Sequence, residues 1–205
     1  MRILGVDPGL ETTGYGLVHV ERRRCQALSH GTIVTDARQT LAERIALLHQ
    51  RFAALLAASA PEVVVLEELY AHYQHPTTAI LMGHARGVIA LAVAQQRLPL
   101  ACYLPTRVKK AVTGNGHATK AQVQGMVTAL LSLPQRPEPD DVSDALALAL
   151  AHAHATSHDR SAFVVQRSAK AVQRQDRQAW LQRLTQNAQR FSPNTERPTP
   201  NEAVA

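Results

Sequence analysis

Four acidic side chains occupy positions where a sheet-forming sequence ordinarily has apolar or turn-forming residues. Asp7 ends the apolar run ILGV just before a Pro-Gly pair, and Glu67 interrupts an apolar run that continues to residue 70. Asp141 and Asp144 lie three residues apart at the start of a predicted helix, a spacing that places both side chains on one face. A carboxylate in or beside a buried strand carries a large desolvation cost unless a partner offsets it.

A divalent cation is the partner that offsets this cost well. Mg²⁺ and Mn²⁺ prefer oxygen ligands, so converging carboxylates without Cys or His are the ligand set expected for them. Two such ions about 3.5 to 4 Å apart can activate a water on one side of a phosphorus atom and stabilise the leaving oxygen on the other. The four acids together predict phosphodiester hydrolysis by two metal ions.

Each acid also has a plainer interpretation when it is taken alone. Asp7 suits a turn, because Asp, Pro and Gly each favour turns. Asp141 and Asp144 suit a helix cap and a first-turn acid that interacts with the helix dipole. Glu67 is harder to explain in this way because its strand is otherwise apolar. The joint occurrence of the four is what favours a metal site.

The elements that must position these acids are three strands followed by helices that alternate with two further strands. Apolar runs predict the strands 2–7, 14–20, 31–35, 62–70 and 100–105. Helical spacing and the positions of prolines predict the helices 40–60, 77–97, 106–113, 119–132 and 140–155. This order predicts an α/β protein with a mixed sheet that opens as an antiparallel meander and is covered by helices.

Composition and the two cysteines limit the class of protein. Hydrophobic residues make up 45% of the 205 residues and aromatic residues 4%, which predicts a core of Ala, Val, Ile and Leu. There is no run of about 18 uncharged apolar residues and no leader segment at the N-terminus, so a soluble cytoplasmic protein without a membrane partner is expected. Cys25 and Cys102 lack nearby partners and are expected to be reduced core residues.

The basic charge is concentrated at the end of the chain. The net charge of +6 and the pI of about 9.8 favour a polyanionic partner. Residues 158–205 hold eight Lys and Arg against four Asp and Glu. We therefore expect a nuclease domain at 1–157 and a basic tail at 158–205 that is partly helical or disordered. The tail would add non-specific DNA affinity or dock on the body through Trp180, and the sequence leaves both open.

Five motifs resemble, in order and spacing, those of the RuvC family of bacterial Holliday junction resolvases. They are ILGVDPGLETTGYGLV, VVVLEELY, GHARGVIA, VKKAVTGNGHATKAQVQGMV and DDVSDALALALAH. The resemblance covers residues 1–157 and implies an RNase H-like fold, a five-stranded mixed β-sheet flanked by α-helices. It implies catalytic and metal-binding roles for Asp7, Glu67, Asp141 and Asp144. Asp140 allows another register, and the three-residue separation from Asp144 favours Asp141.

The resemblance also implies an activity and its partners. The chain is expected to be a crossover junction endodeoxyribonuclease that resolves four-way DNA junctions by paired symmetric nicks during recombination and repair. Two Mg²⁺ ions per site, for which Mn²⁺ would substitute, are implied, with 5′-phosphate and 3′-hydroxyl ends as products. A homodimer is implied, because an isologous dimer presents two equivalent sites to a two-fold junction. The RuvA–RuvB branch-migration complex is the implied protein partner.

Five residues are implied to bind DNA. Lys109 and Lys120 align with lysines that contact phosphates near the cut, which would make binding salt-dependent without reading bases. Tyr70 aligns with an aromatic that stacks on an unpaired base at the junction centre, and Tyr73 is the alternative because the loop is one residue longer than in some relatives. Arg86 lies in GHARG, on a helix that helps form the family's dimer interface, and either a phosphate contact or an interface role is open.

Three rival interpretations remain at this point. One is a nuclease of the anti-resolvase-like YqgF group, which shares the D-P-G strand but lacks the GHARG and VKKAVTGNG motifs. Another is an actin-like phosphotransferase, which requires two large domains. The third is a catalytically silent junction-binding module whose acids are only helix caps and turn residues.

Overall fold

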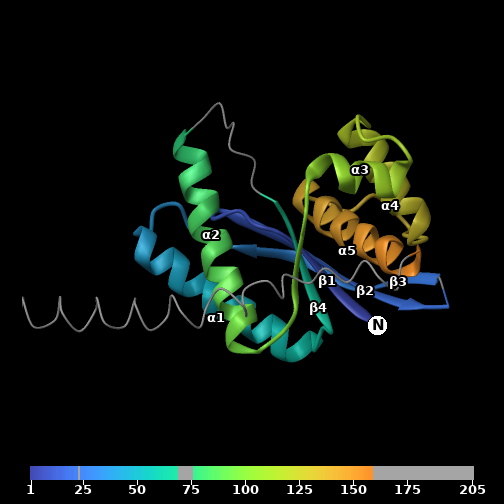
Figure 1. Ribbon diagram of the computed structural model, residues 1–205. Helices are drawn as coiled ribbons and strands as arrows, with labels where there is room; N and C mark the ends of the chain where they lie inside the picture. The colour runs from blue at the N-terminus through green and yellow to red at the C-terminus, as the bar shows by residue number, and fades with distance from the viewer. Residues whose placement is uncertain (23, 69–75, 159–205) are drawn as a thin grey trace, which may run out of the picture. The chain divides into compact units, whose positions relative to one another are not determined.

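A computed structural model describes residues 1–22, 24–68 and 76–158 of the chain. Within them, five strands form one sheet with helices on both faces (Figure 1). The strands are β1 (Arg2–Asp7), β2 (Thr12–Glu21), β3 (Arg24–Val34), β4 (Val63–Glu67) and β5 (Leu100–Tyr103). The helices are α1 (Leu41–Ser59), α2 (Pro76–Gln95), α3 (Pro105–Thr113), α4 (Lys120–Leu130) and α5 (Asp140–His158). The predicted tail begins at the end of α5, and the predicted domain boundary stays a prediction.

The sheet is mixed and has the strand order β3-β2-β1-β4-β5. Strands β1, β2 and β3 are antiparallel neighbours, which confirms the predicted meander, while β4 pairs in parallel with β1 and with β5. Parallel strands end at the same edge of a sheet. Since the register pairs Val6 with Leu66, the next residues, Asp7 and Glu67, lie side by side at this edge.

Two strand boundaries differ from the sequence prediction by three residues or more. Strand β3 begins at Arg24 rather than residue 31, since residues 24–30, whose polar character predicts a connection, pair with β2. It is an edge strand whose side chains are mostly exposed, so polar residues are tolerated there. Strand β4 ends at Glu67 rather than continuing to residue 70. Glu67 therefore stands at a strand end rather than within a strand.

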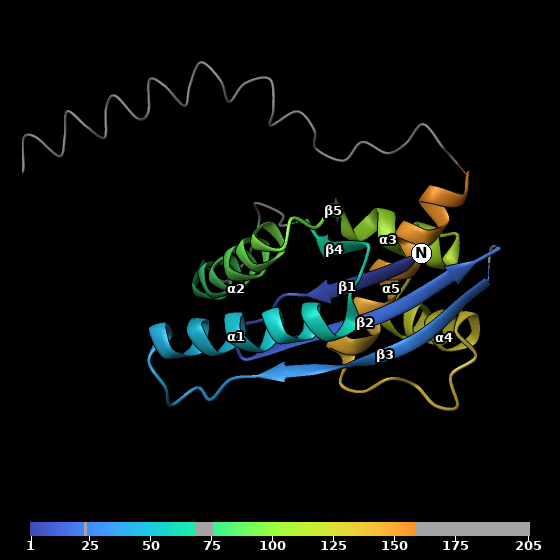
Figure 2. The same ribbon diagram turned by 90° about the horizontal axis from the view of Figure 1, so that it is seen from below.

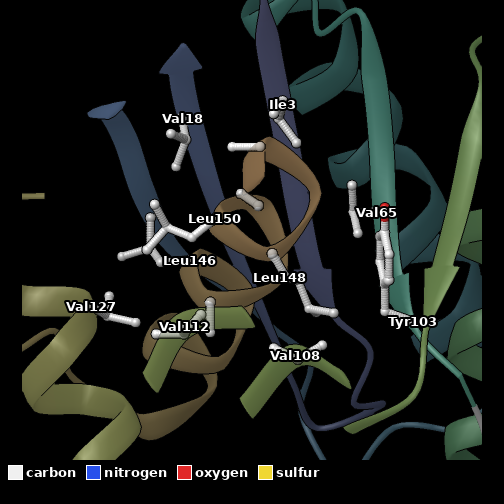
Figure 3. Close-up of a cluster of buried hydrophobic side chains, with 14 of the residues drawn as sticks. Ile3, Val18, Val65, Tyr103, Val108, Val112, Val127, Leu146, Leu148 and Leu150 are labelled. Carbon is white, nitrogen blue, oxygen red and sulfur yellow. The ribbon is translucent and has the colours of Figure 1, made fainter. Parts of the chain in front are cut away.

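Alternate residues of the strands supply two separate cores, one on each face of the sheet. Leu4 and Val6 of β1 pack with α1 and α2, whereas Ile3 packs with α3, α4 and α5. Figure 2 shows the same arrangement from below, with α1 and α5 on opposite sides of the strands. Figure 3 shows the second core with these residues labelled: Ile3, Val18, Val65, Tyr103, Val108, Val112, Val127, Leu146, Leu148 and Leu150.

Helix α5 packs directly on the backbone of β1 and β2 because glycines face it. A β-carbon added at Gly5 would lie 1.9 Å from the carbonyl oxygen of Ala145, and one added at Gly14 would lie 2.1 Å from that of Asp141. Only a residue without a side chain allows so close an approach. The close packing brings the first turns of α5 to the end of β1, where Asp7 lies.

Helix α2 has one buried and one exposed apolar side. Ala85 and Ile89 are fully buried, whereas Ile80 is 61% and Leu91 52% exposed. Among the described residues this is the one helix long and apolar enough, over Thr77–Gln95, to cross a membrane by length and composition. Helices that contribute to a protein core pass the same test, so this is weak evidence for a membrane span.

The expectation that both cysteines lie in the core is wrong for one of them. Cys25 is half-buried against the core that α5 covers, but Cys102 is exposed. Cys102 belongs to β5, which forms an edge of the sheet, so a neighbouring strand covers it on one side only.

Candidate active site

Four predicted acids gather where β1, β4 and α5 meet. Asp7 ends β1, Glu67 ends β4, and Asp141 and Asp144 lie in the first turns of α5. Burial, and after it repulsion by Asp144, Glu67 and Asp141, raises the pKa of Asp7 to about 7. The charge of Asp7 is therefore coupled to all three of the other acids, although 60 to 137 residues separate them in sequence.

Two more acids of the cluster have raised pKa values. Burial raises the pKa of Glu67, and Asp144 adds to this effect, while Lys109, Arg86 and Lys120 oppose it. Burial likewise raises the pKa of Asp144 against the opposing influence of Lys120. Buried carboxylates with mutually raised pKa values are destabilising for the fold when they are charged. Such strained groups mark functional sites more often than ordinary surface positions.

The structure distinguishes Asp141 from its neighbour Asp140. Asp140 is exposed and points to α4, where Lys120 Nζ lies 3.1 Å from its Oδ2 and Gln124 Nε2 donates to its Oδ1 at 2.6 Å. These two contacts lower the pKa of Asp140. Asp141 instead lines a groove together with Asp7. The geometry thus places Asp141 with the cluster, as the predicted register requires.

Both predicted lysines line a cavity of about 250 Å³ beside Glu67 and Asp144. Lys120 is the first residue of α4, whose start is fixed by a capping box of Thr119 and Gln122. Its Nζ lies 3.2 Å from Asp144 Oδ2 as well as close to Asp140. The lysines bring positive charge to the Glu67 and Asp144 side of the acid cluster.

A second groove, of about 510 Å³, lies on the Asp7 and Asp141 side of the cluster. Arg44 of α1 and Thr78 of α2 also line it. Arg44 is fixed by a hydrogen bond from its Nε to Thr35 Oγ1 at 2.9 Å. The cluster thus borders two cavities, one on the Glu67 and Asp144 side and one on the Asp7 and Asp141 side. The sequence does not identify Arg44 as a site residue, because Arg44 is far from the acids along the chain and belongs to none of the five motifs.

The structure places Arg86 differently from either sequence interpretation. Its guanidinium points inward to the sheet, where Nη1 donates to the backbone carbonyl of Glu67 and Nη2 donates to Cys102 Sγ at 3.1 Å. Tyr70 and Tyr73, the predicted stacking residues, lie outside the described residues, so their roles stay predictions.

The donor set of the cluster fits a hard divalent cation in its chemistry. All four side chains are carboxylates, and neither Cys nor His takes part. Among residues 1–22, 24–68 and 76–158, no three acidic, His or Cys side chains lie close enough to hold a metal ion in the positions seen here. Charges that raise one another's pKa repel, and a shared cation is the group that would draw these carboxylates together.

Comparisons with known proteins agree with this geometry. The family model for crossover junction endodeoxyribonuclease RuvC matches residues 3–152. A curated relative, the crossover junction endodeoxyribonuclease RuvC of Rhodopirellula baltica, is 48% identical over 71% of this chain and 82% of its own. The structure of Thermus thermophilus RuvC superposes with a TM-score of 0.72 at 34% identity, covering 77% of this chain and 96% of that one. Thermus thermophilus RuvC in complex with a Holliday junction substrate superposes with a TM-score of 0.71 at 31% identity over the same shares.

Proposed function

The chain belongs to the RuvC family of crossover junction endodeoxyribonucleases, and we propose that it resolves four-way DNA junctions by two symmetric nicks during recombination and repair. The observation that carries the proposal is the convergence of Asp7, Glu67, Asp141 and Asp144 at one sheet edge in a chain of this family. A relative solved with a Holliday junction supports the choice of substrate. The silent-module alternative gives no reason for three partly buried carboxylates, those of Asp7, Glu67 and Asp144, to lie together with raised pKa values.

The four carboxylates are the residues that would hold Mg²⁺ or Mn²⁺, and we propose two ions per site. When bound, such ions lower the pKa of the attacking water and stabilise the leaving 3′ oxygen, which gives 5′-phosphate and 3′-hydroxyl ends. The carboxyl group of Asp7, whose pKa is raised to about 7, must lose its proton to act as a ligand. Lys109 and Lys120 would hold the DNA backbone on the Glu67 and Asp144 side.

We propose that the exposed side of α2 pairs with the same helix of a second copy. Ile80 and Leu91 are large, apolar and more than half exposed on this side. Added β-carbons at Gly83 and Gly87 would meet nothing within 4 Å, so another backbone has room to approach there. A two-fold dimer would supply one active site for each of two opposed strands.

Three further points stay proposals, one implied by the family resemblance and two by the composition and charge of the chain. They are a cytoplasmic location, cooperation with a RuvA–RuvB branch-migration complex, and a DNA-affinity role for the basic tail at 158–205. Deletion of the tail would leave junction affinity and its salt dependence unchanged if that last role is wrong.

The experiment that tests the function is cleavage of a synthetic four-way junction with Mg²⁺ or Mn²⁺. We expect the wild type to nick two opposed strands of the junction and to leave a linear duplex of the same sequence intact. Asp7→Asn and Glu67→Gln should bind the junction with near wild-type affinity and fail to cut it. Substantial cutting by either variant, or no cutting by the wild type with any divalent ion, would refute the proposed function.

A further inference from the structure

We propose that Arg86 is a positioning residue of the nuclease site, because it supplies a hydrogen bond that the proline of the D-P-G motif cannot make and so fixes the backbone at Glu67. This inference rests on the proposed nuclease function. It assigns Arg86 neither to DNA nor to the dimer interface, the two roles that the sequence left open.

The register of the sheet shows which hydrogen bond is missing. The Glu68 N–H donates to the Tyr103 carbonyl of β5 at 2.8 Å. Since the carbonyl of one residue and the N–H of the next point to opposite sides of a strand, the Glu67 carbonyl points away from β5 and toward β1. With Val6 paired to Leu66 in a parallel ladder, the donor for this carbonyl would be the N–H of residue 8.

Residue 8 is a proline, so this donor does not exist. The ladder between β1 and β4 accordingly ends at the Val6–Leu66 pair, one residue before Asp7 and Glu67. The two acids that the site needs at neighbouring strand ends therefore follow the last regular pair. Without another donor, the Glu67 carbonyl would be unpaired and the end of β4 would lack this hydrogen bond on the side that faces β1.

Arg86 takes the place of the missing donor. Its Nη1 donates to the Glu67 carbonyl, and its Nη2 donates to Cys102 Sγ of β5 at 3.1 Å. One planar guanidinium thereby connects the ends of two adjacent strands to α2, a geometry that a lysine cannot reproduce with a single ammonium. Ala85 and Ile89, on the same helix, are fully buried and hold this part of α2 against the sheet.

The charge of Arg86 supports the same role. The guanidinium is among the groups that oppose the rise in the pKa of Glu67. It thus favours the ionised carboxylate while its hydrogen bond fixes the backbone that carries it. Asp7 of the D-P-G motif and Gly83 of the GHARG motif are 76 residues apart. The two motifs act together, since the first lacks a hydrogen-bond donor at Pro8 and the second supplies one from Arg86.

The test compares Arg86→Met, which removes the donors and keeps the aliphatic stem, with a matched control. Arg51→Met is that control, since Arg51 Nη1 also donates to a strand-end carbonyl, that of Val34, at 3.0 Å. We expect Arg86→Met to lower the single-turnover cleavage rate about tenfold to a hundredfold, as for a misplaced catalytic group. Junction Kd, its salt slope and the dimer fraction should stay unchanged, and Arg51→Met should cut at the wild-type rate.

A second substitution tests the hydrogen-bond argument itself. Pro8→Ala restores an N–H at position 8. Arg86→Met should therefore lower the cleavage rate less in the Pro8→Ala background than in the wild-type background. Equal losses in both backgrounds would overturn the inference. If Arg86→Met does not fold, Arg86→Lys, which keeps one donor and the charge, replaces it in the cycle.

Other outcomes separate this inference from its rivals and from the proposed function. A raised junction Kd with a reduced salt slope and an unchanged cleavage rate would make Arg86 a phosphate contact and overturn the inference. Dissociation of the dimer would make it an interface residue and also overturn it. Failure of the wild type to cut junctions would refute the proposed function instead, because that result does not depend on Arg86.

Discussion

The contact between α5 and Gly5 predicts that a single methyl group displaces half of the active site. A β-carbon at Gly5 would lie 1.9 Å from the Ala145 carbonyl oxygen and 2.9 Å from the Ala149 nitrogen, both backbone atoms that no side-chain rotation can move. Ordinary contact begins at 3.4 Å, so Gly5→Ala requires α5 to withdraw from β1 by about 1.5 Å. Asp141 and Asp144 move with the helix, whereas Asp7 stays with the strand.

Two measured effects follow from this displacement. Overpacking of this kind should lower the free energy of unfolding by about 1–3 kcal/mol. A displacement of about 1 Å between reacting groups should lower the cleavage rate about a hundredfold. Urea unfolding gives the first quantity, and single-turnover cleavage of a four-way junction at a temperature where the variant is fully folded gives the second.

The matched control is Gly125→Ala in α4. An added β-carbon there meets nothing within 4 Å, so this variant should be more stable by about 0.5–1 kcal/mol, as for alanine in a helix interior, and fully active. If Gly5→Ala unfolds at the wild-type urea concentration and cuts at the wild-type rate, α5 is not held against β1 as described. Loss of stability without loss of rate at saturating metal would refute the coupling of this packing to the site.

Three more predictions concern charged groups of the site. Because the pKa of Asp7 is raised to about 7 in the folded protein, stability is lost as the pH rises from about 4 to 7. Asp7→Asn should therefore stabilise the protein against urea by about 1–4 kcal/mol at pH 8 without divalent ions, and this gain should vanish near pH 4. Lys120→Gln should weaken junction binding and lower the slope of log Kd against log salt by about 1, unlike Lys110→Gln, whose exposed side chain is outside the cavity; equal slopes in filter binding would contradict this. Asp141→Asn should abolish cleavage while Asp140→Asn retains it, and the reverse result in a junction assay would reassign the register.

Much of the fold follows from local pattern. Apolar runs and helical spacing predict the five strands, the helices and the mixed sheet, and these are confirmed. The RNase H-like class, which the family resemblance implies, is confirmed as well. Two of the errors lie where burial is one-sided. Strand β3 and Cys102 both belong to sheet edges, where polar or exposed residues are compatible with a strand and local sequence gives a weak signal.

The sequence by itself determined which side chains the site has, since four carboxylates at element ends are chemically conspicuous wherever they stand. Only the tertiary structure decided how they are held. The role of Gly5 depends on Ala145, which is 140 residues away in sequence, and the role of Arg86 in α2 depends on a proline that directly follows β1. Local propensity reflects neighbours along the chain, whereas a missing β-carbon or a missing N–H has its effect on whatever segment folds against it.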